Sequence, residues 1–157
     1  MLIIFDLDNT LYDCSAQIPD NYTLKDVEGI SLFSGVREFL TNFPGKLVLV
    51  THETDSGLQD KKIDMLKIRN LFDKIFICPN NEAKRDCFKQ ALDLFPNSKT
   101  FVVGDRVDGE IKYGNELGCV TVRVKIGKYK NIAVKDKFEN PDYEINRFEQ
   151  LNEIVRP

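Results

Sequence analysis

The sequence contains a single histidine, His52, and only four cysteines among its 157 residues. One histidine cannot build a metal cluster by itself, and the cysteines, at spacings of 64, 9 and 32, match no zinc-binding pattern. A chain of this length can bury a sizeable core and does not need disulfide staples. The sequence therefore argues against a zinc module and a disulfide scaffold, and it favours reduced thiols in a cytoplasmic protein.

Long apolar runs are also missing. The longest are short segments such as Leu47–Val50, far below the roughly 20 residues of a membrane span. The start lacks the basic region and the apolar core of a signal peptide, so we expect neither a signal peptide nor contact with a membrane. The net charge of −3 argues against a protein that wraps nucleic acid, so nucleic acid is not indicated as a partner. With 42% hydrophobic and 30% charged residues, we expect one globular domain over residues 1–157.

Short apolar or β-branched segments alternate with helical patterns along the chain. The segments typical of buried strands are Leu2 to Phe5, Lys46 to Val50, Lys74 to Cys78, Thr100 to Val103 and Cys119 to Val124. Helices are predicted around Val36 to Phe43, Ser56 to Lys67, Phe88 to Phe95, Asp108 to Leu117 and Phe148 to Val155. This alternation predicts an α/β, Rossmann-like domain with a parallel five-stranded sheet and helices on both faces.

Polar side chains follow three of these strands. Asp6 and Asp8 come after the first strand, Thr51 follows the second, and Asp105 follows the fourth. Doubly wound sheets bind their ligands at the carboxyl ends of strands, so we expect these side chains to meet. A buried carboxylate costs several kcal/mol unless a positive group faces it. Oxygen ligands of this kind suit Mg²⁺, which we predict as the cofactor.

Four short motifs with these residues resemble, in order, the four motifs of the haloacid dehalogenase superfamily. They are Asp6-x-Asp8-x-Thr10 after an apolar strand, Thr51 after LVLV, Lys84 ahead of a helix, and Asp105 within VVGDRVDGE. The resemblance covers essentially the whole chain. Two departures concern the third and fourth motifs. Glu110 stands where the family usually has a second aspartate, and the segment after Lys84 is about two residues shorter than is common, so Lys84 is assigned by best fit.

The resemblance implies a Mg²⁺-dependent phosphatase, that is, a phosphoric monoester hydrolase. Asp6 would attack phosphorus and form an aspartyl-phosphate, and Asp8 would act as general acid and then as base. The metal would be held by Asp6, the backbone carbonyl of Asp8, and Asp105. Thr51 and Lys84 would bind the phosphoryl oxygens.

Three further residues are expected around this set. Thr10 belongs to the first motif, and Glu110 or Asp108 would orient Lys84 or a metal-bound water. Asp108 also fits the N-cap of the helix that follows. His52 either contacts phosphate or is a loop residue.

The spacing of the motifs leaves no room for a cap domain. Asp6 to Thr51 spans 45 positions and Thr51 to Lys84 spans 33, and the predicted helices take up most of both. An uncapped site is open, as in members of this superfamily that act on macromolecular ends or large phosphoesters, or that close their sites with a second subunit. The partner we expect is a phosphorylated small molecule or a macromolecular end. The segment from Arg123 to Phe138 carries six basic residues and one acidic residue, and it is either a solvated face or a guide for anionic substrates.

Other classes remain as alternatives. A dehalogenase lacks the second aspartate, so Asp8 argues against one, and a phosphomutase needs a cap to exclude water. A receiver-like module carries its acceptor aspartate after the third strand, where this chain has Cys78-Pro79. A catalytically inactive regulatory or binding module would be expected to lose Asp6, Asp8 or Asp105. The sequence gives neither the physiological substrate nor the oligomeric state.

Overall fold

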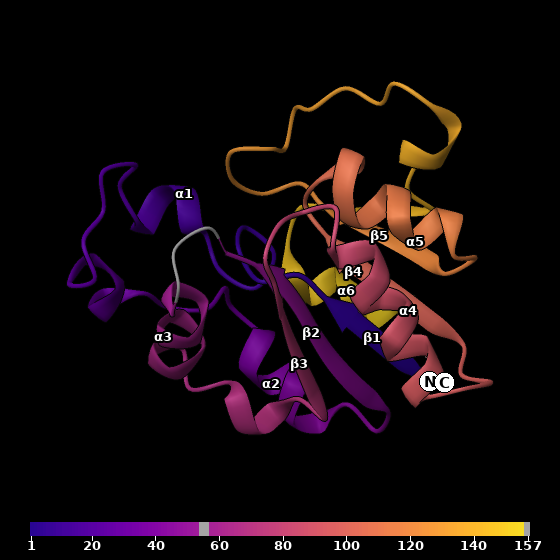
Figure 1. Cartoon of the computed structure of the whole chain (residues 1–157), viewed down its shortest axis with the longest axis horizontal. Helices are drawn as coiled ribbons and strands as arrows, with labels where there is room; N and C mark the ends of the chain where they lie inside the picture. Colours follow the sequence, from indigo (N-terminus) through magenta and orange to yellow (C-terminus); the bar gives the residue numbers. More distant parts are fainter. Residues whose placement is uncertain (54–56, 156–157) are drawn as a thin grey trace.

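The computed structural model describes residues 1–53 and 57–155. In these residues six parallel strands form one sheet in the order β3-β2-β1-β4-β5-β6 (Figure 1). The strands are β1 (Leu2–Phe5), β2 (Lys46–His52), β3 (Lys74–Cys78), β4 (Thr100–Gly104), β5 (Val120–Val124) and β6 (Tyr143–Ile145). The predicted α/β Rossmann-like architecture is therefore confirmed.

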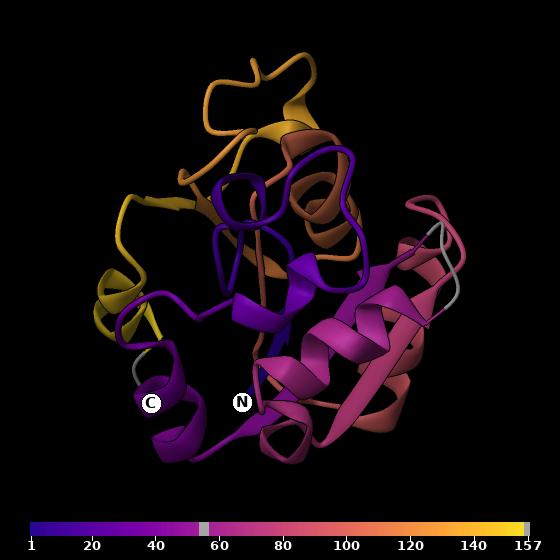
Figure 2. The same cartoon turned by 90° about the vertical axis from the view of Figure 1, so that its left-hand side faces the viewer.

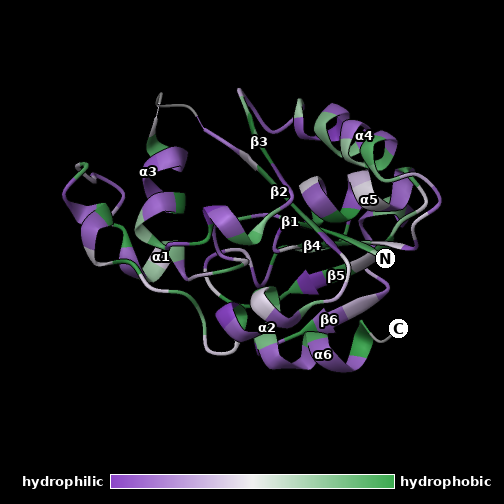
Figure 3. Cartoon of the chain, turned by 90° about the horizontal axis from the view of Figure 1, so that it is seen from below, coloured by the Kyte–Doolittle hydropathy of each residue, from purple (hydrophilic) through white to green (hydrophobic). Residues whose placement is uncertain are grey.

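Helices cover both faces of the sheet because the strand side chains alternate between two apolar clusters. Ile3 and Phe5 of β1 point into one cluster, and Leu2 and Ile4 point into the other. Figure 3 shows α2 and α6 on one side of the sheet and α4 and α5 on the other. The helices are α1 (Cys14–Gln17), α2 (Val36–Asn42), α3 (Leu58–Met65), α4 (Lys84–Leu94), α5 (Lys112–Glu116) and α6 (Leu151–Ile154).

Short helical turns complete the connections. They are η1 (Asp26–Gly29), η2 (Arg69–Leu71), η3 (Val107–Ile111), η4 (Lys137–Glu139) and η5 (Phe148–Gln150). Of these, η3 is a π-helical turn, a form that often occurs at functional sites. None of the helices in the described residues is long and apolar enough to cross a bilayer.

The predicted sheet of five strands is wrong by one strand. The sixth, β6, has only three residues and lies at the sheet edge, where Tyr143 and Glu144 are exposed and only Ile145 is buried. A strand with one buried residue has no apolar run that a sequence pattern could reveal. The predicted start of a helix at Ser56 lies outside the described residues, and α3 begins at Leu58.

The order of the strands places the polar residues in one crevice. The chain moves outward from β1 to β2 and β3, then returns to the other side of β1 as β4, so β1 and β4 flank the point where the order reverses. Asp6 follows β1, and its backbone N–H donates to the carbonyl of Val103 on β4 at 3.0 Å. Asp105 follows β4 directly. The carboxyl ends of β1, β2 and β4 therefore present Asp6, Thr51 and Asp105 together.

Candidate active site

A buried ion-pair network centres on Lys84, the first residue of α4. Its ammonium donates to Oδ1 of Asp6 and to Oε1 of Glu110, each at 2.6 Å, and only 2% of the lysine is exposed. Although burial alone lowers it, the pKa of Lys84 is raised above its ordinary value by the carboxylates of Asp6 and Glu110. The lysine chosen by best fit to the third motif therefore does lie against Asp6.

Three buried carboxylates share the crevice with this one lysine. Oxygens of Asp6, Asp105 and Glu110 lie within 4.8 Å of one another, an arrangement that could hold a metal ion. Burial raises the pKa of Asp6 to about 7, although Lys84 acts to lower it, and burial raises that of Asp105 well above its usual range, with repulsion from Glu110 adding to the effect. Oδ2 of Asp105 is buried and has no hydrogen-bond partner among residues 1–53 and 57–155. A divalent cation would be the missing partner of this Asp105 oxygen and would supply the missing positive charge, so these residues fit Mg²⁺.

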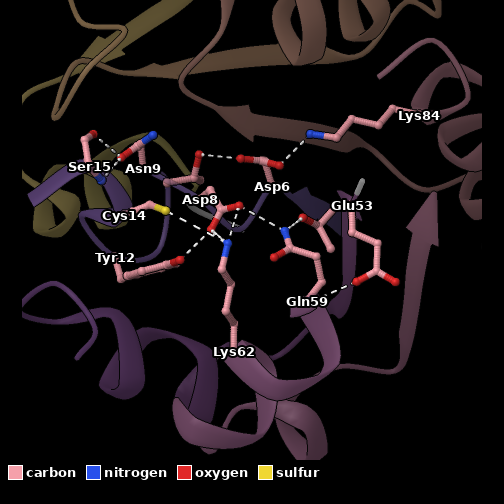
Figure 4. Close-up of polar contacts among 12 residues, drawn as sticks. Asp6, Asp8, Asn9, Tyr12, Cys14, Ser15, Glu53, Gln59, Lys62 and Lys84 are labelled. Carbon is pink, nitrogen blue, oxygen red and sulfur yellow. Dashed lines mark hydrogen bonds and ion pairs between the residues drawn. The ribbon is translucent and has the colours of Figure 1, made fainter. Parts of the chain in front are cut away.

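Asp8 has a separate set of partners, which the sequence did not reveal. Its carboxylate accepts from the Lys62 ammonium at 2.9 and 3.0 Å, from the Gln59 amide at 2.9 Å and from the Tyr12 hydroxyl (Figure 4). Burial acts to raise the pKa of Asp8, but the charge of Lys62 and the hydrogen bonds hold it below its usual value. Asp6 and Asp8 thus have different electrostatic environments although one residue separates them.

The partners of Asp8 come from one helix and from the loop after β1. Gln59 and Lys62 lie on α3, where Lys62 is only 4% exposed. Leu58, Lys62 and Leu66 follow one another at intervals of four, so Lys62 lies on the apolar stripe of this helix. A cation in the middle of such a stripe was the one available signal that Lys62 is buried against a carboxylate.

The two threonines of the motifs are buried close to the aspartates. Thr10 donates its hydroxyl to Oδ2 of Asp6 at 3.3 Å. Thr51 is the sixth residue of β2, which runs one residue further to His52, and its hydroxyl accepts from the Gln59 amide at 2.6 Å. Gln59 therefore links Thr51 to Asp8 and fixes the two side chains relative to each other.

Asp108 does not join Lys84 in the described contacts. Its carboxylate pairs with the Arg106 guanidinium through two hydrogen bonds at 2.8 and 2.9 Å. The prediction that Asp108 is a helix N-cap is wrong, because Asp108 lies inside η3, whose N-cap is Arg106. Glu110, by contrast, contacts Lys84 and also accepts from the backbone N–H of Arg106 at 3.2 Å.

A cavity of about 290 Å³ opens above these residues. Its floor holds the predicted set of Asp6, Asp8, Thr51, Lys84 and Asp105. Its walls come from two segments that lie far apart in sequence, 14–22 and 128–129, together with His52, Lys62, Arg106 and other side chains. Burial lowers the pKa of His52, and the charge of Lys84 adds to this effect, so His52 faces the cavity as a neutral ring at pH 7.

Among the described residues, no separate cap unit is inserted between the motifs. Asp6 to Thr51 holds α1, η1 and α2, and Thr51 to Lys84 holds α3, η2 and β3. Figures 1 and 2 show the segment with α1 and the segment that follows β5 at the same end of the sheet. Residues of both segments line the cavity.

Comparisons with known proteins show which proteins the chain resembles. A family model described as HAD-hydrolase-like matches residues 82–151, which contain Lys84, Asp105 and Glu110. Over these residues the chain is similar to hydrolases of the haloacid dehalogenase (HAD) superfamily. The expected resemblance is therefore confirmed, whereas the roles assigned to individual residues remain predictions.

The chain is similar to two curated proteins named glyceraldehyde 3-phosphate phosphatase. It is 43% identical to the protein of Methanopyrus kandleri over 111 residues, which are 64% of this chain and 47% of the relative. It is 31% identical to that of Pyrococcus furiosus over 102 residues, 62% of this chain and 42% of the relative. The matched part thus spans less than half of each relative.

Solved structures share the fold. The magnesium-bound HAD-hydrolase YfnB from Bacillus subtilis has a TM-score of 0.77 at 17% identity, with 99% of this chain and 98% of that chain covered. The L-2-haloacid dehalogenase from Xanthobacter autotrophicus has a TM-score of 0.70 at 11% identity, with coverages of 99% and 98%. At such low identity these likenesses show the fold alone.

Proposed function

We propose that this chain is a Mg²⁺-dependent phosphomonoesterase that forms an aspartyl-phosphate on Asp6. The observation that carries the proposal is the buried cluster in which three carboxylates meet a single lysine. Such an excess of buried negative charge is unfavourable unless a divalent cation offsets it. Clusters of this kind are typical of catalytic sites. Mg²⁺, held by Asp6, Asp105 and the backbone carbonyl of Asp8 with Glu110 beside it, would neutralise charge on the phosphoryl oxygens.

The chain's own residues divide the reaction into two displacements. An Asp6 carboxylate oxygen attacks phosphorus while the bond from phosphorus to the ester oxygen breaks, and Asp8 gives its proton to the departing oxygen. Asp8 then takes a proton from water, the resulting hydroxide attacks phosphorus, and the bond to Asp6 breaks to release inorganic phosphate. Lys84 and the Thr51 hydroxyl stabilise the phosphoryl oxygens in both steps.

The partners of Asp8 suit a group that must change its protonation state. In the free site Lys62 keeps Asp8 ionised, which is the form needed as base in the second step. A phosphate dianion that enters the cavity places negative charge near Asp8 and so raises its pKa. Substrate binding therefore favours the protonated form that the first step requires.

The substrate we propose is a small phosphate ester. The two curated relatives are named for glyceraldehyde 3-phosphate, which makes this ester the first to test. The cavity of about 290 Å³ lies at the lower end of the size range of ligand pockets, and segments 14–22 and 128–129 wall it. A small ester fits such a space better than the end of a macromolecule.

Hydrolysis of an aryl phosphate tests the proposed function directly. We expect phosphate release from phenyl phosphate in the presence of Mg²⁺ and complete loss of release in EDTA, with recovery when Mg²⁺ is restored. Asp105→Asn should require a higher Mg²⁺ concentration because it removes one charged ligand from the cluster. Full turnover in EDTA would contradict the proposal.

The contact between Lys62 and Asp8 gives a second test. Lys62→Met keeps the length of the side chain but removes the cation that orients the Asp8 carboxylate at 2.9 Å. We expect kcat/KM, which reports the steps up to the first phosphoryl transfer, to fall by roughly 10²-fold for an alkyl phosphate, whose leaving oxygen needs the proton from Asp8. The loss should be smaller for phenyl phosphate, which has a better leaving group.

A matched control lies next to Lys62 in the sequence. Lys61 is on the same helix, but its ammonium points to the carbonyl of Leu24 and to Glu28, away from Asp8. Lys61→Met should leave both rates close to those of the unmodified protein. Equal losses for the alkyl and aryl esters in Lys62→Met would show that Lys62 does not act through Asp8.

A further inference from the structure

The loop that follows β5 is held by an arginine buried beneath it. Arg123, on β5, is only 4% exposed, and its Nη2 donates to the backbone carbonyls of Tyr129, Lys130 and Ile132 at 3.1, 3.3 and 2.9 Å. Three carbonyls that meet one guanidinium fix the path of the loop without regular secondary structure. The interpretation of the segment from Arg123 to Phe138 as a solvated face is therefore wrong for Arg123, which is buried.

The same loop is tied to the residues that follow Asp8. The backbone N–H of Lys128 donates to Oγ of Ser15 at 3.1 Å, and this hydroxyl donates to Oδ1 of Asn9 at 2.7 Å. Figure 4 shows Asn9 and Ser15 beside Asp8. Gly127 has a φ of +77°, and a Cβ there would lie 3.0 Å from Oδ1 of Asn9. The positive φ and the close approach both favour glycine, so the loop packs tightly against the residues that follow Asp8.

Two cations flank one aromatic ring on this loop. The Arg106 guanidinium lies 5.0 Å from the centre of the Tyr129 ring, and the Lys128 ammonium lies 5.7 Å from it. All three side chains line the cavity that contains Asp6 and Lys84. Arg106 is already paired with Asp108. Lys128, in contrast, has no carboxylate within 4.0 Å among the described residues, so its positive charge is available to a ligand.

We propose that the loop 125–132 is the specificity loop of this site, and that Lys128 binds an oxygen atom of the substrate on the carbon skeleton away from the phosphoryl group. The proposal rests on the proposed function and deepens it, because it names a class of small phosphate esters that carry a carbonyl or carboxylate oxygen. The Tyr129 ring supports the lysine, and Arg123 and Ser15 hold the loop in place.

The test measures binding, so that it does not depend on turnover. In an Asp6→Asn background with Mg²⁺, the dissociation constants of glyceraldehyde 3-phosphate, 3-phosphoglycerate and phenyl phosphate are measured by calorimetry, with and without Lys128→Met. We expect Lys128→Met to weaken binding of the first two by roughly 10-fold or more, the effect of losing one charge-assisted hydrogen bond. Phenyl phosphate has no oxygen beyond its phosphoryl group, so its binding should not change. Lys130→Met, an exposed lysine on the same loop, is the control.

The outcomes separate the two proposals. A loss limited to 3-phosphoglycerate identifies a carboxylate as the group that Lys128 binds, and equal losses for both esters identify a carbonyl oxygen. An equal loss of affinity for phenyl phosphate, or no loss of affinity for any ester, would overturn the proposal that loop 125–132 sets the specificity of this site. Hydrolysis of phenyl phosphate by the unmodified protein tests the phosphatase function independently, because Lys128 has no part in that reaction.

Discussion

Asp6→Asn should abolish both turnover and the covalent phosphoenzyme. The substitution keeps the size of the side chain but replaces the attacking oxygen by an amide, so no bond to phosphorus can form. We expect kcat to fall on the order of 10⁴-fold to 10⁶-fold, as when an enzyme loses its nucleophile. Acid-quenched mass spectrometry of the unmodified protein should find one phosphoryl group on the peptide that contains Asp6, and none in the variant.

Asp8→Asn should fail in a different way, which makes it the informative control. The variant keeps the nucleophile but loses the proton donor and the base for hydrolysis. With phenyl phosphate we expect a burst of phenol followed by a slow steady state, because Asp6 is still phosphorylated but is hydrolysed slowly. A phosphoryl group on Asp8, or sustained turnover by Asp6→Asn, would show that the two roles are assigned wrongly.

The core of the fold could be predicted because its strands are buried on both faces. The run at Leu2–Phe5 matched β1 at both ends, since all four of its residues are apolar and buried. The run at Lys74–Cys78 matched β3 at both ends as well, although β3 is an edge strand in which only Cys78 is fully buried. The strand Tyr143–Ile145 was missed because an edge strand needs only one buried side chain. A run of apolar residues in the sequence therefore reveals a strand only where several of its side chains pack against the core.

The proximity of Asp6 and Asp105 could be predicted because each comes directly after a strand, and that of Lys84 because a motif assigns it. Asp6 and Asp105 meet because the ends of neighbouring strands must meet, and the structure brings Lys84 to them from the start of α4. Lys62 was missed because its position between Leu58 and Leu66, at intervals of four, indicates burial but does not show which carboxylate the lysine contacts. The loop around Lys128 was equally hidden, because its path depends on hydrogen bonds from Arg123 rather than on a repeated pattern.

The charges of the buried cluster do not balance without a metal ion. Lys84 balances a single negative charge, whereas Asp6, Asp105 and Glu110 together carry three when ionised. Without a cation, burial keeps the pKa of Asp6 at about 7, so protons and metal compete for the same oxygens. Mg²⁺ should therefore bind more tightly as the pH rises from 6 to 8, because fewer protons must be displaced.

Lys84→Ala should lower kcat by roughly 10²-fold or more, the scale of losing one preorganised electrostatic donor. The ammonium lies 2.6 Å from the proposed nucleophile, in a site with almost no exposure to water, so no solvent cation can replace it. The measurement is the steady-state rate with phenyl phosphate at saturating Mg²⁺. The melting temperature of the variant is recorded with Mg²⁺, because removal of Lys84 leaves buried carboxylates that only the metal then offsets.

Lys89 provides the matched control for this result. It lies on the same helix, but it is exposed and its ammonium is 3.8 Å from Asp86, an exposed ion pair of little energetic value. Lys89→Ala should therefore leave both kcat and the melting temperature almost unchanged. Full activity of a folded Lys84→Ala protein would show that Lys84 does not act on the phosphoryl group. A loss of activity confined to Lys89→Ala would show that Lys89, and not Lys84, is the lysine of the third motif. If Lys84→Ala does not fold, Lys84→Gln keeps a hydrogen-bond donor in the cluster without the charge, and the same loss of kcat is then expected in that variant.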